Sequence, residues 1–328
     1  MADPGEVVAR LVRNDVVESV HHGHVVVCAA DGTVLAARGD ADRLTYVRSA
    51  VKPFQAVAVL DLLASAGKDL TVDGLAIACA SHDGSDDQQI EAARLLAEAD
   101  LEESALQCPP AVPREPATAY AQRWPYPLSH NCSGKHAAFL LATVAVGADP
   151  ASYLALDNPV QQRAREVIEE CCGAPAQGPG IDGCGAPAWL LPLRALATGF
   201  ARLAAGATPR LERVRDAMSA RPALVGGTTA TDSRLMLGDP ALVAKRGAEA
   251  VFGVGMNRGA ASLGVAVKIT DGGTRADAPA AAAVLQALGA SVDEDLVRPP
   301  VLGGAVAQGA LEVDSAVAAL GRTAAAAG

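Results

Sequence analysis

Runs of apolar residues predict strands near both ends of the chain. In the first part, apolar runs over 16–29 and 33–37 flank the pair Asp31-Gly32, which is typical of a β-hairpin turn. Strand patterns return late in the chain, over 241–245, 249–254 and 263–270. A shorter apolar run over 75–79 is a further strand candidate. This distribution predicts a sheet that N-terminal and C-terminal segments form together.

Helical periodicity and capping signals dominate the middle of the chain. The pattern predicts a helix over 49–66, with Pro53 tolerated in its first turns. The Ser-Asp-Asp-Gln segment at 85–88 has the spacing of a capping box, which opens a helix that runs to about residue 99. Further helices are predicted over 133–146, 158–171, 187–205, 209–220 and 277–289. The proline-rich stretch 108–127 is expected to be an irregular connection, and the alanine-rich tail is expected to be frayed.

Together these elements predict an α/β (α+β) protein with an antiparallel sheet. Hairpins rather than regular βαβ alternation carry the strands, which favours antiparallel pairing. Helices would flank the sheet, and the helical middle would form a region inserted between the strands of the two termini. Because the sequence has no internal repeat and no flexible linker long enough to separate domains, residues 1–328 are expected to form a single domain.

Composition narrows the class of protein. The chain is 50% hydrophobic and 20% charged, as in a soluble globular protein. Its net charge of −10 argues against a nucleic-acid partner, and no apolar run reaches the ~20 residues of a membrane span. Residues 1–6 lack the basic start and the apolar stretch of a secretory signal. Seven cysteines, an odd number, favour reduced thiols and a cytoplasmic location.

Lysine is rare in this chain, and its positions are therefore informative. Five of the 27 basic residues are lysine, and four of the five lie in motif-like segments: Lys52, Lys135, Lys245 and Lys268. Arginine keeps its proton, whereas a buried lysine can become a neutral amine that serves as a base or a ligand. The retained lysines are candidates for chemistry; the alternative is simply an arginine-biased composition.

Serine and lysine form three candidate catalytic segments. Ser49 and Lys52 have a Ser-x-x-Lys spacing at a predicted helix start, where both side chains would share one face, and the same spacing marks penicillin-binding proteins and serine β-lactamases. Ser81 lies in a loop after a predicted strand, where active groups are frequent. Lys245 and Gly247 form a Lys-x-Gly on a late strand, as in the penicillin-recognising fold. An ordinary turn at Ser81 and a solvated charge at Lys245 are the structural alternatives.

Two cysteines lie among glycine and polar residues rather than in apolar runs. Cys132 belongs to the segment 130–136 (His-Asn-Cys-Ser-Gly-Lys-His), and Cys184 follows Asp182 in a glycine-rich segment. Thiolates with nearby histidine or lysine nitrogens suit a zinc ion, although the chain has no Cys-x-x-Cys pair here. Alternatively, Cys132 is a nucleophile with His136 as its base and Asp182 as the group that orients the histidine. The spacing alone leaves both interpretations open.

Five segments, in this order, resemble the rhizobial-type (thermolabile) L-asparaginase II family. They are Arg48-Ser49-x-x-Lys52-Pro53-x-Gln55, Cys79-Ala80-Ser81-His82, Asn131-Cys132-Ser133-Gly134-Lys135-His136, Asp182-Gly183-Cys184 and Lys245-x-Gly247-Ala248. The resemblance runs from about residue 6 to about residue 290, and the Asn-Cys-Ser-Gly-Lys-His segment is long enough to be specific.

The resemblance implies a fold like that of the serine β-lactamases and glutaminases, a homodimer, and hydrolysis of L-asparagine to L-aspartate and ammonia. It implies two catalytic serine–lysine pairs, Ser49 with Lys52 and Ser81 with Lys245. The implied zinc ligands are Cys132, Lys135 and Cys184. The implied substrate-binding residues are Arg48, His82, Asn131, His136 and Asp182.

A mechanism follows as a hypothesis. Ser49 forms a β-aspartyl ester with Lys52 as its base. Ser81 and Lys245 relay protons, and the two serines could exchange these roles. Zinc would orient the substrate rather than generate the nucleophile, because a serine is already available.

Alternatives and departures accompany this hypothesis. The alternatives are a glutaminase or a serine esterase or peptidase of the same fold, and a non-catalytic protein that binds zinc or asparagine. The chain departs from the family pattern at Arg246, where a smaller or neutral residue is expected. It departs again in the segment 226–230, which lacks an arginine and ends at Ala230.

Overall fold

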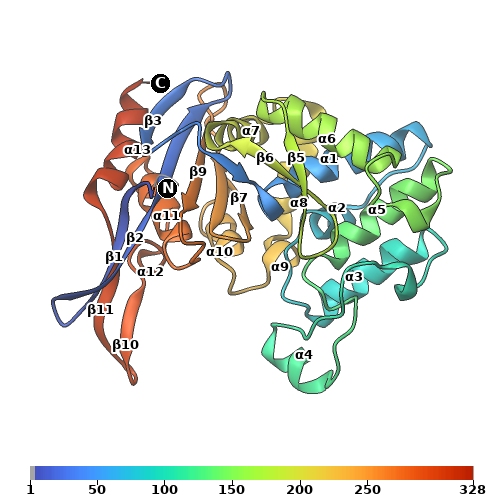
Figure 1. Ribbon diagram of the computed structural model, residues 1–328, viewed down its shortest axis with the longest axis horizontal. Coiled ribbons are helices and arrows are strands. Elements are labelled where there is room, and N and C mark those ends of the chain that lie inside the picture. The colour runs from blue at the N-terminus through green and yellow to red at the C-terminus, as the bar shows by residue number, and fades with distance from the viewer. Residues whose placement is uncertain (1–3, 328) are drawn as a thin grey trace.

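The computed structural model describes residues 4–327 and is built around one eight-stranded antiparallel sheet (Figure 1). The strand order is β10-β11-β1-β2-β9-β8-β7, and β3 also pairs with β2. The strands are β1 (Glu6–Arg13), β2 (Val16–Ala29), β3 (Val34–Arg38), β7 (Leu242–Gly247), β8 (Val251–Met256), β9 (Leu263–Ile269), β10 (Pro300–Gly303) and β11 (Val306–Val313). The long strand β2 pairs with both β1 and β9, and so joins the N-terminal strands to the late ones. The predicted antiparallel sheet built from both ends of the chain is confirmed.

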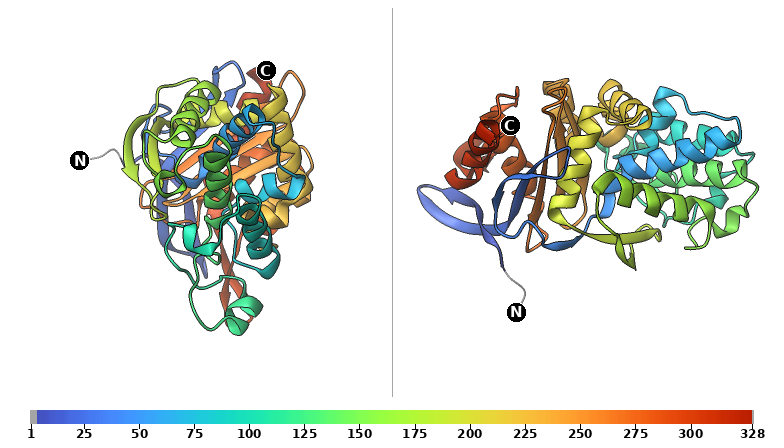
Figure 2. Two further views of the ribbon diagram at one scale, coloured as in Figure 1. Left: turned by 90° about the vertical axis from the view of Figure 1, so that its right-hand side faces the viewer. Right: turned by 90° about the horizontal axis from the view of Figure 1, so that it is seen from above.

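Helices cover both faces of the sheet (Figure 2). One face carries α11 (Asp277–Ala287) and α13 (Ser315–Ala327), and the other carries α7 (Leu193–Ala205). The close approach of α7 depends on glycine, because a Cβ at Gly264 on β9 would overlap the carbonyl of Ala197 on α7. The sheet is thus buried on both sides, which explains the almost continuous apolar character of β8 and β9.

The inserted helical region forms the right-hand part of the molecule in Figure 1. Its longer helices are α1 (Lys52–Ser65), α2 (Val72–Ala78), α3 (Asp86–Ala97), α5 (Ser133–Ala145), α6 (Pro159–Cys172) and α8 (Pro209–Ala220). α1 is apolar on most sides and packs against α5, α6 and α8, as a central buried helix does. Because Lys52 is the first residue of α1, this packing holds a lysine inside the molecule.

Short elements complete the fold. A small sheet has the order β4-β6-β5, formed by β4 (Leu44–Tyr46), β6 (Pro187–Pro192) and β5 (Gln177–Ile181). The short helices are η1 (Arg48–Val51), η2 (Glu103–Ala105), α4 (Pro116–Ala121), η3 (Pro150–Ser152), α9 (Pro222–Gly226), α10 (Thr231–Gly238) and α12 (Glu294–Val297). Within residues 4–327, no helix has the length and apolar character needed to cross a membrane.

Most predicted elements are present, including the hairpin at Asp31-Gly32, the three late strands and the capping box that opens α3. The strand prediction for 75–79 is wrong, because this run lies at the end of α2. The hydroxyl of Thr71 accepts a hydrogen bond from the Gly74 N–H and so caps α2 at its start. A short apolar run has no period that separates a strand from a buried helix.

Two further predictions are wrong in part. Residues 187–192 form β6 rather than the start of a helix, and α7 begins only after Pro192. The tail is not frayed up to residue 327: it forms α13, which packs against α11 and buries Val317, Leu320 and Ala324. β1, β10 and β11 were not anticipated because their apolar alternation is weak and half exposed.

Candidate active site

A cavity of about 720 Å³ lies beside β7, which is an edge strand of the large sheet. Its walls come from η1, from the loops before α3, α4, α5, α10 and α11, and from the β5–β6 and β7–β8 turns. Each of the five motif segments contributes to the wall, through Ser49, Ser81, Cys132, Cys184 and Gly247 among others. Segments that are far apart in the sequence therefore converge on one chamber.

Lys52 lies behind the lining of this chamber, in contact with lining residues. Its side chain is buried at the start of α1, and its ammonium nitrogen lies 3.2 Å from the Oγ of Ser81 and 3.1 Å from the Sγ of Cys132. It also donates to the carbonyl oxygens of Ala80 and Asn131. Ser49 lines the cavity, but its hydroxyl makes no hydrogen bond to any residue between 4 and 327. The structure thus brings Lys52 to Ser81, and does not bring it into hydrogen-bond contact with Ser49.

Lys245 lies behind the chamber wall on β7 and is fully buried. Its Nζ lies 3.3 Å from Oδ2 of Asp232 and 2.8 Å from the carbonyl oxygen of Arg246. Burial lowers the pKa of Lys245 to about 7, and the nearby positive charges of Arg246 and Lys52 act in the same direction, against Asp232. In the described part of the chain Lys245 makes no hydrogen bond to Ser81, so the second expected serine–lysine pair is not in contact.

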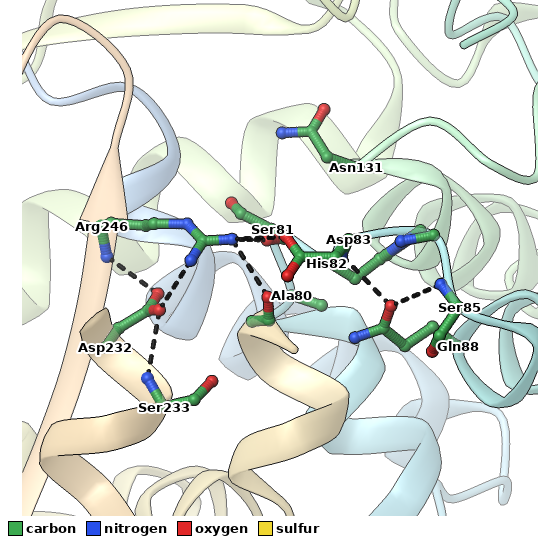
Figure 3. A network of polar contacts seen from close by, with 12 residues as sticks. Ala80, Ser81, His82, Asp83, Ser85, Gln88, Asn131, Asp232, Ser233 and Arg246 are labelled. Carbon is green, nitrogen blue, oxygen red and sulfur yellow. Dashed lines mark hydrogen bonds and ion pairs between the residues drawn. The ribbon is translucent and has the colours of Figure 1, made fainter. Parts of the chain in front are cut away.

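Arg246 is the centre of a polar network beside Ser81 (Figure 3). Its Nη2 donates to the carbonyl oxygen of Ser81 at 2.7 Å, to the carbonyl oxygen of Gly226 at 3.1 Å and to Oδ1 of Asp83 at 3.2 Å. Its Nη1 and its backbone N–H both reach the carboxylate of Asp232, at 3.2 Å each. The arginine at this unexpected position joins β7, α10 and the loop of Ser81.

Cys132, Lys135 and Cys184 form a second cluster, which adjoins Lys52 through Cys132. The Nζ of Lys135 lies 3.3 Å from the Sγ of Cys184. A hydrogen bond with Cys184, together with the charges of nearby lysines, holds the pKa of the Cys132 thiol well below its ordinary range despite burial. Burial alone would lower the pKa of Lys135, but the two neighbouring thiols raise it. Two soft sulfur donors and one amine nitrogen therefore lie together, as the predicted zinc set requires.

Comparison with known proteins adds to this geometry. The family model for L-asparaginase II matches residues 9–312. The chain belongs to the L-asparaginase II family. The matched range includes all five motif segments. The comparison with curated proteins gives no match.

Solved structures of Mglu are similar to this L-asparaginase II family member at low identity. The native form of Mglu shares 15% sequence identity at a TM-score of 0.42, over 84% of this chain and 66% of that chain. The L-glutamate binding form in 4.3 M NaCl shares 16% at a TM-score of 0.43, over 84% of this chain and 61% of that chain. The family member thus spans less than two thirds of the length of the solved chains that it matches.

The substrate-binding residues expected for the L-asparaginase II family occupy two different settings. Arg48, Asn131 and Asp182 line the cavity, and Arg48 forms a 2.8 Å ion pair with Asp182. This ion pair lowers the pKa of Asp182 against the effect of burial. His82 and His136 are buried and are not part of the cavity lining. Burial lowers the pKa of His82 to about 3, and its Nε2 lies 2.9 Å from the hydroxyl of Ser133.

His136 lies next to the cysteine cluster. Its Nδ1 lies 2.6 Å from the hydroxyl of Tyr153, and burial lowers the pKa of the imidazole to about 4. Its Nε2 is buried and has no hydrogen-bond partner within the described chain. No group of three or more His, Cys, Asp and Glu side chains able to hold a metal ion occurs between residues 4 and 327. The predicted zinc set differs from such groups because one of its three donors is a lysine.

Sequence reasoning missed four charged residues at this site. Asp232 joins Lys245 and Arg246, while Arg114, Glu249 and Asp277 line the cavity. None of the four lies in a motif whose spacing indicates chemistry. One signal was present for Asp232, since a buried lysine on a strand requires an acidic or polar partner.

Proposed function

We propose that this family member hydrolyses L-asparagine to L-aspartate and ammonia, with a serine nucleophile activated by lysine. The observation that carries the proposal is the 3.2 Å contact between the buried Lys52 Nζ and the Oγ of Ser81, which lines a polar cavity. A hydroxyl beside a buried amine is the arrangement that amide attack requires. This contact supports Ser81 as the nucleophile and Lys52 as its base, with Ser49 as the second serine of the chamber.

The atoms balance in two half-reactions. As a neutral amine, Lys52 accepts the proton of Ser81 Oγ while that oxygen attacks the side-chain carbonyl carbon of asparagine. Lys52 returns the proton to the departing nitrogen, so ammonia leaves and a β-aspartyl ester of Ser81 remains. Water then attacks the ester and gives a proton to Lys52, and return of that proton to Ser81 Oγ releases aspartate.

Lys245 and Arg246 influence the pair of Lys52 and Ser81, the first by its charge and the second by a hydrogen bond. The charge of Lys52 contributes to the lowered pKa of Lys245, so the two amines are close enough that protonating both is unfavourable. Arg246 holds the carbonyl of Ser81 and fixes the loop that carries the nucleophile.

Zinc is part of the proposal as a resident ion. Cys132, Lys135 and Cys184 would hold it, and the unpartnered Nε2 of His136 leaves a further nitrogen donor beside them. When bound, the ion would supply positive charge that helps to orient and polarise the substrate. Ligation requires Lys135 as a neutral amine, so zinc binding should release a proton and weaken as the pH falls.

Ammonia release from L-asparagine and from L-glutamine tests the function, with zinc content measured on the same sample. We expect faster release from asparagine and about one zinc per chain. The Ser81→Ala variant should lose turnover, and Ser49→Ala should keep most of it. The opposite result would assign the nucleophile to Ser49, and no release from either amide would refute the proposed function.

We also propose a homodimer, which the family resemblance implies, and a cytoplasmic location, which the odd number of cysteines favours. Sedimentation of the purified protein at several concentrations would measure its mass in solution. A monomer at all concentrations would contradict the expected dimer.

A further inference from the structure

Some charged side chains of the cavity lining form no ion pair within the described part of the chain. Arg48 and Asp182 neutralise each other, and Arg246 is held by two carboxylates. Three charged residues of the lining have no ion pair with any residue between 4 and 327: Arg114, Glu249 and Asp277. Groups of this kind are available to a ligand, and they carry both signs of charge.

Asp277 is the buried member of this set. Its side chain, 4% exposed, stands at the first residue of α11, where the loop from Gly272 reaches the cavity. Oδ1 accepts the N–H of Ala278 at 2.8 Å, and Oδ2 has no hydrogen-bond partner in the described chain. Burial raises the pKa of Asp277 to about 7, with the charge of Asp232 acting in the same direction and that of Arg246 against it. A carboxyl group in this state lacks a cation, and a bound ammonium group would provide one.

Arg114 is the unpaired cation at the mouth of the same cavity. Its backbone N–H donates to the carbonyl oxygen of Asp83 at 2.7 Å, which fastens the loop before α4 to the cavity wall. The guanidinium itself is exposed and makes no hydrogen bond within residues 4–327. It lies close enough to Asp83 to oppose the rise that burial causes in the pKa of that carboxyl. A planar cation free at a cavity mouth suits a carboxylate, which it can bind through two N–H groups.

We infer that Asp277 and Arg114 form a clamp for a zwitterion: Asp277 binds the α-ammonium group of the substrate and Arg114 binds its α-carboxylate. The inference rests on the proposed amide hydrolysis and adds to it the residues that select an amino-acid amide over a simple amide. Glu249 is the rival carboxylate for the ammonium group. It is exposed on the β7–β8 turn, and an exposed carboxylate gains less from a cation than a buried one does.

Three small amides test Asp277 and Arg114, the two residues of the clamp, independently of each other. L-asparagine carries both charged groups, succinamate lacks the ammonium group, and β-alaninamide lacks the α-carboxylate. For Asp277→Asn, kcat/KM should fall about 10- to 100-fold for L-asparagine and β-alaninamide and stay within about threefold for succinamate. For Arg114→Ala, it should fall about tenfold for L-asparagine and succinamate and stay nearly constant for β-alaninamide.

Two variants serve as controls. Arg123→Ala removes an exposed arginine that follows α4 and lies outside the cavity lining, and it should change none of the three values. Glu249→Gln should affect the three amides alike or not at all. The clamp is overturned if Asp277→Asn lowers all three values equally, as a general distortion would, or if Glu249→Gln shows the ammonium-specific loss.

Binding measurements distinguish failure of the clamp from failure of the proposed function. If the unmodified protein hydrolyses none of the three amides, the proposed reaction is wrong, and calorimetric binding of the same compounds tests the clamp. The clamp then stands only if Asp277→Asn weakens binding of L-asparagine and spares succinamate, while Arg114→Ala spares β-alaninamide. Absence of binding by the unmodified protein, or equal losses for all compounds, overturns it.

Discussion

Lys52 and Lys245 are both buried behind the lining of the cavity, yet their surroundings differ in kind. The neighbours of Lys52 are three uncharged oxygens (Ala80 O, Asn131 O and Ser81 Oγ) and the Sγ of Cys132, whose pKa is well below its ordinary value. Lys245 instead faces the carboxylate of Asp232, which Arg246 also binds. One lysine adjoins reactive side chains, and the other belongs to an ion cluster inside the protein.

This difference shows how two buried lysines of one site can have different roles. A lysine beside a hydroxyl can exchange a proton with that hydroxyl, and such a lysine contributes to catalysis. A lysine beside a buried carboxylate balances charge, and its removal leaves an uncompensated ion. We therefore expect substitutions at the first lysine to affect turnover most and substitutions at the second to affect stability most.

Replacing the first lysine should have the largest effect. Lys52→Met removes the base of the proposed reaction, and kcat for L-asparagine should fall by about 10³-fold. Ammonia release measures the loss, and circular dichroism and zinc content on the same sample show whether the fold is retained. Lys68→Met, an exposed lysine beyond the end of α1, is the matched control and should be fully active. If the Lys52→Met enzyme kept more than a tenth of normal turnover, Lys52 would not be the catalytic base, and the contrast between the two lysines would be wrong.

Replacing the second lysine should act on stability instead. Lys245→Met leaves Asp232 buried with Arg246 as its remaining cation, and the free energy of unfolding should fall by about 3 to 5 kcal/mol. Urea denaturation measures this change. A double variant that adds Asp232→Asn should recover part of the loss, because the buried charge is gone. If Lys245→Met lowered kcat as much as Lys52→Met without a loss of stability, the two lysines would share one role.

Much of the fold was predictable from the sequence, because hairpin turns, capping residues and proline positions act locally. Asp31-Gly32 gave the first hairpin, and the Ser85 capping box gave the start of α3. Burial decided the elements that failed. Residues 75–78 are helical because Thr71 caps α2 and the helix packs against α5 and α8, neither of which a short apolar run reveals.

For the site, the sequence led to the right segments but not to their contacts. All five motif segments reach the cavity, yet the Ser-x-x-Lys spacing pointed to Ser49 as the partner of Lys52. Ser49 stands on the 3₁₀ turn η1 and Lys52 opens α1, and the ammonium group of Lys52 contacts Ser81 instead of Ser49. The tie between Arg246 and Asp232 joins β7 to α10, and no local pattern encodes it.

A pH series on Asp277 tests whether a buried carboxyl group without a partner cation affects stability as much as the buried pair of Lys245 and Asp232 does. The folded pKa of about 7 lies above the ordinary 3.8, so the folded state holds a proton that the unfolded state has lost between these pH values. The contribution of Asp277 to stability therefore falls as the pH rises through this window. Relative to the unmodified protein, Asp277→Asn should gain about 2 to 3 kcal/mol of unfolding free energy between pH 5 and pH 8.

Urea denaturation at each pH measures that gain, with Asp182→Asn as the comparison. Asp182 lines the same cavity, but its pKa is lowered by Arg48, so its contribution should change in the opposite sense below pH 4. A pH-independent difference for Asp277→Asn would mean that the carboxyl group is ionised in the folded protein and has found a cation.

The smallest effect is expected where the two lysine surroundings meet, at Arg246. Arg246→Lys keeps the positive charge but has no planar fork, so one ammonium group cannot hold the carbonyls of Ser81 and Gly226 together with both carboxylates. We expect kcat/KM for L-asparagine to fall about tenfold, with most of the loss in kcat, because the Ser81 loop loses its support.

Arg234→Lys is the matched control, because Arg234 on α10 binds the carboxylates of Asp293 and Asp295 but lies outside the cavity lining. It should leave kcat unchanged, which separates a general cost of replacing arginine from the specific loss of the Ser81 contact. If Arg246→Lys raised KM and left kcat intact, Arg246 would act on the substrate rather than on Ser81. The Lys245 cluster would then belong to the binding surface of the cavity, and the division between a reactive lysine and a supporting one would have to be redrawn around Lys52 alone.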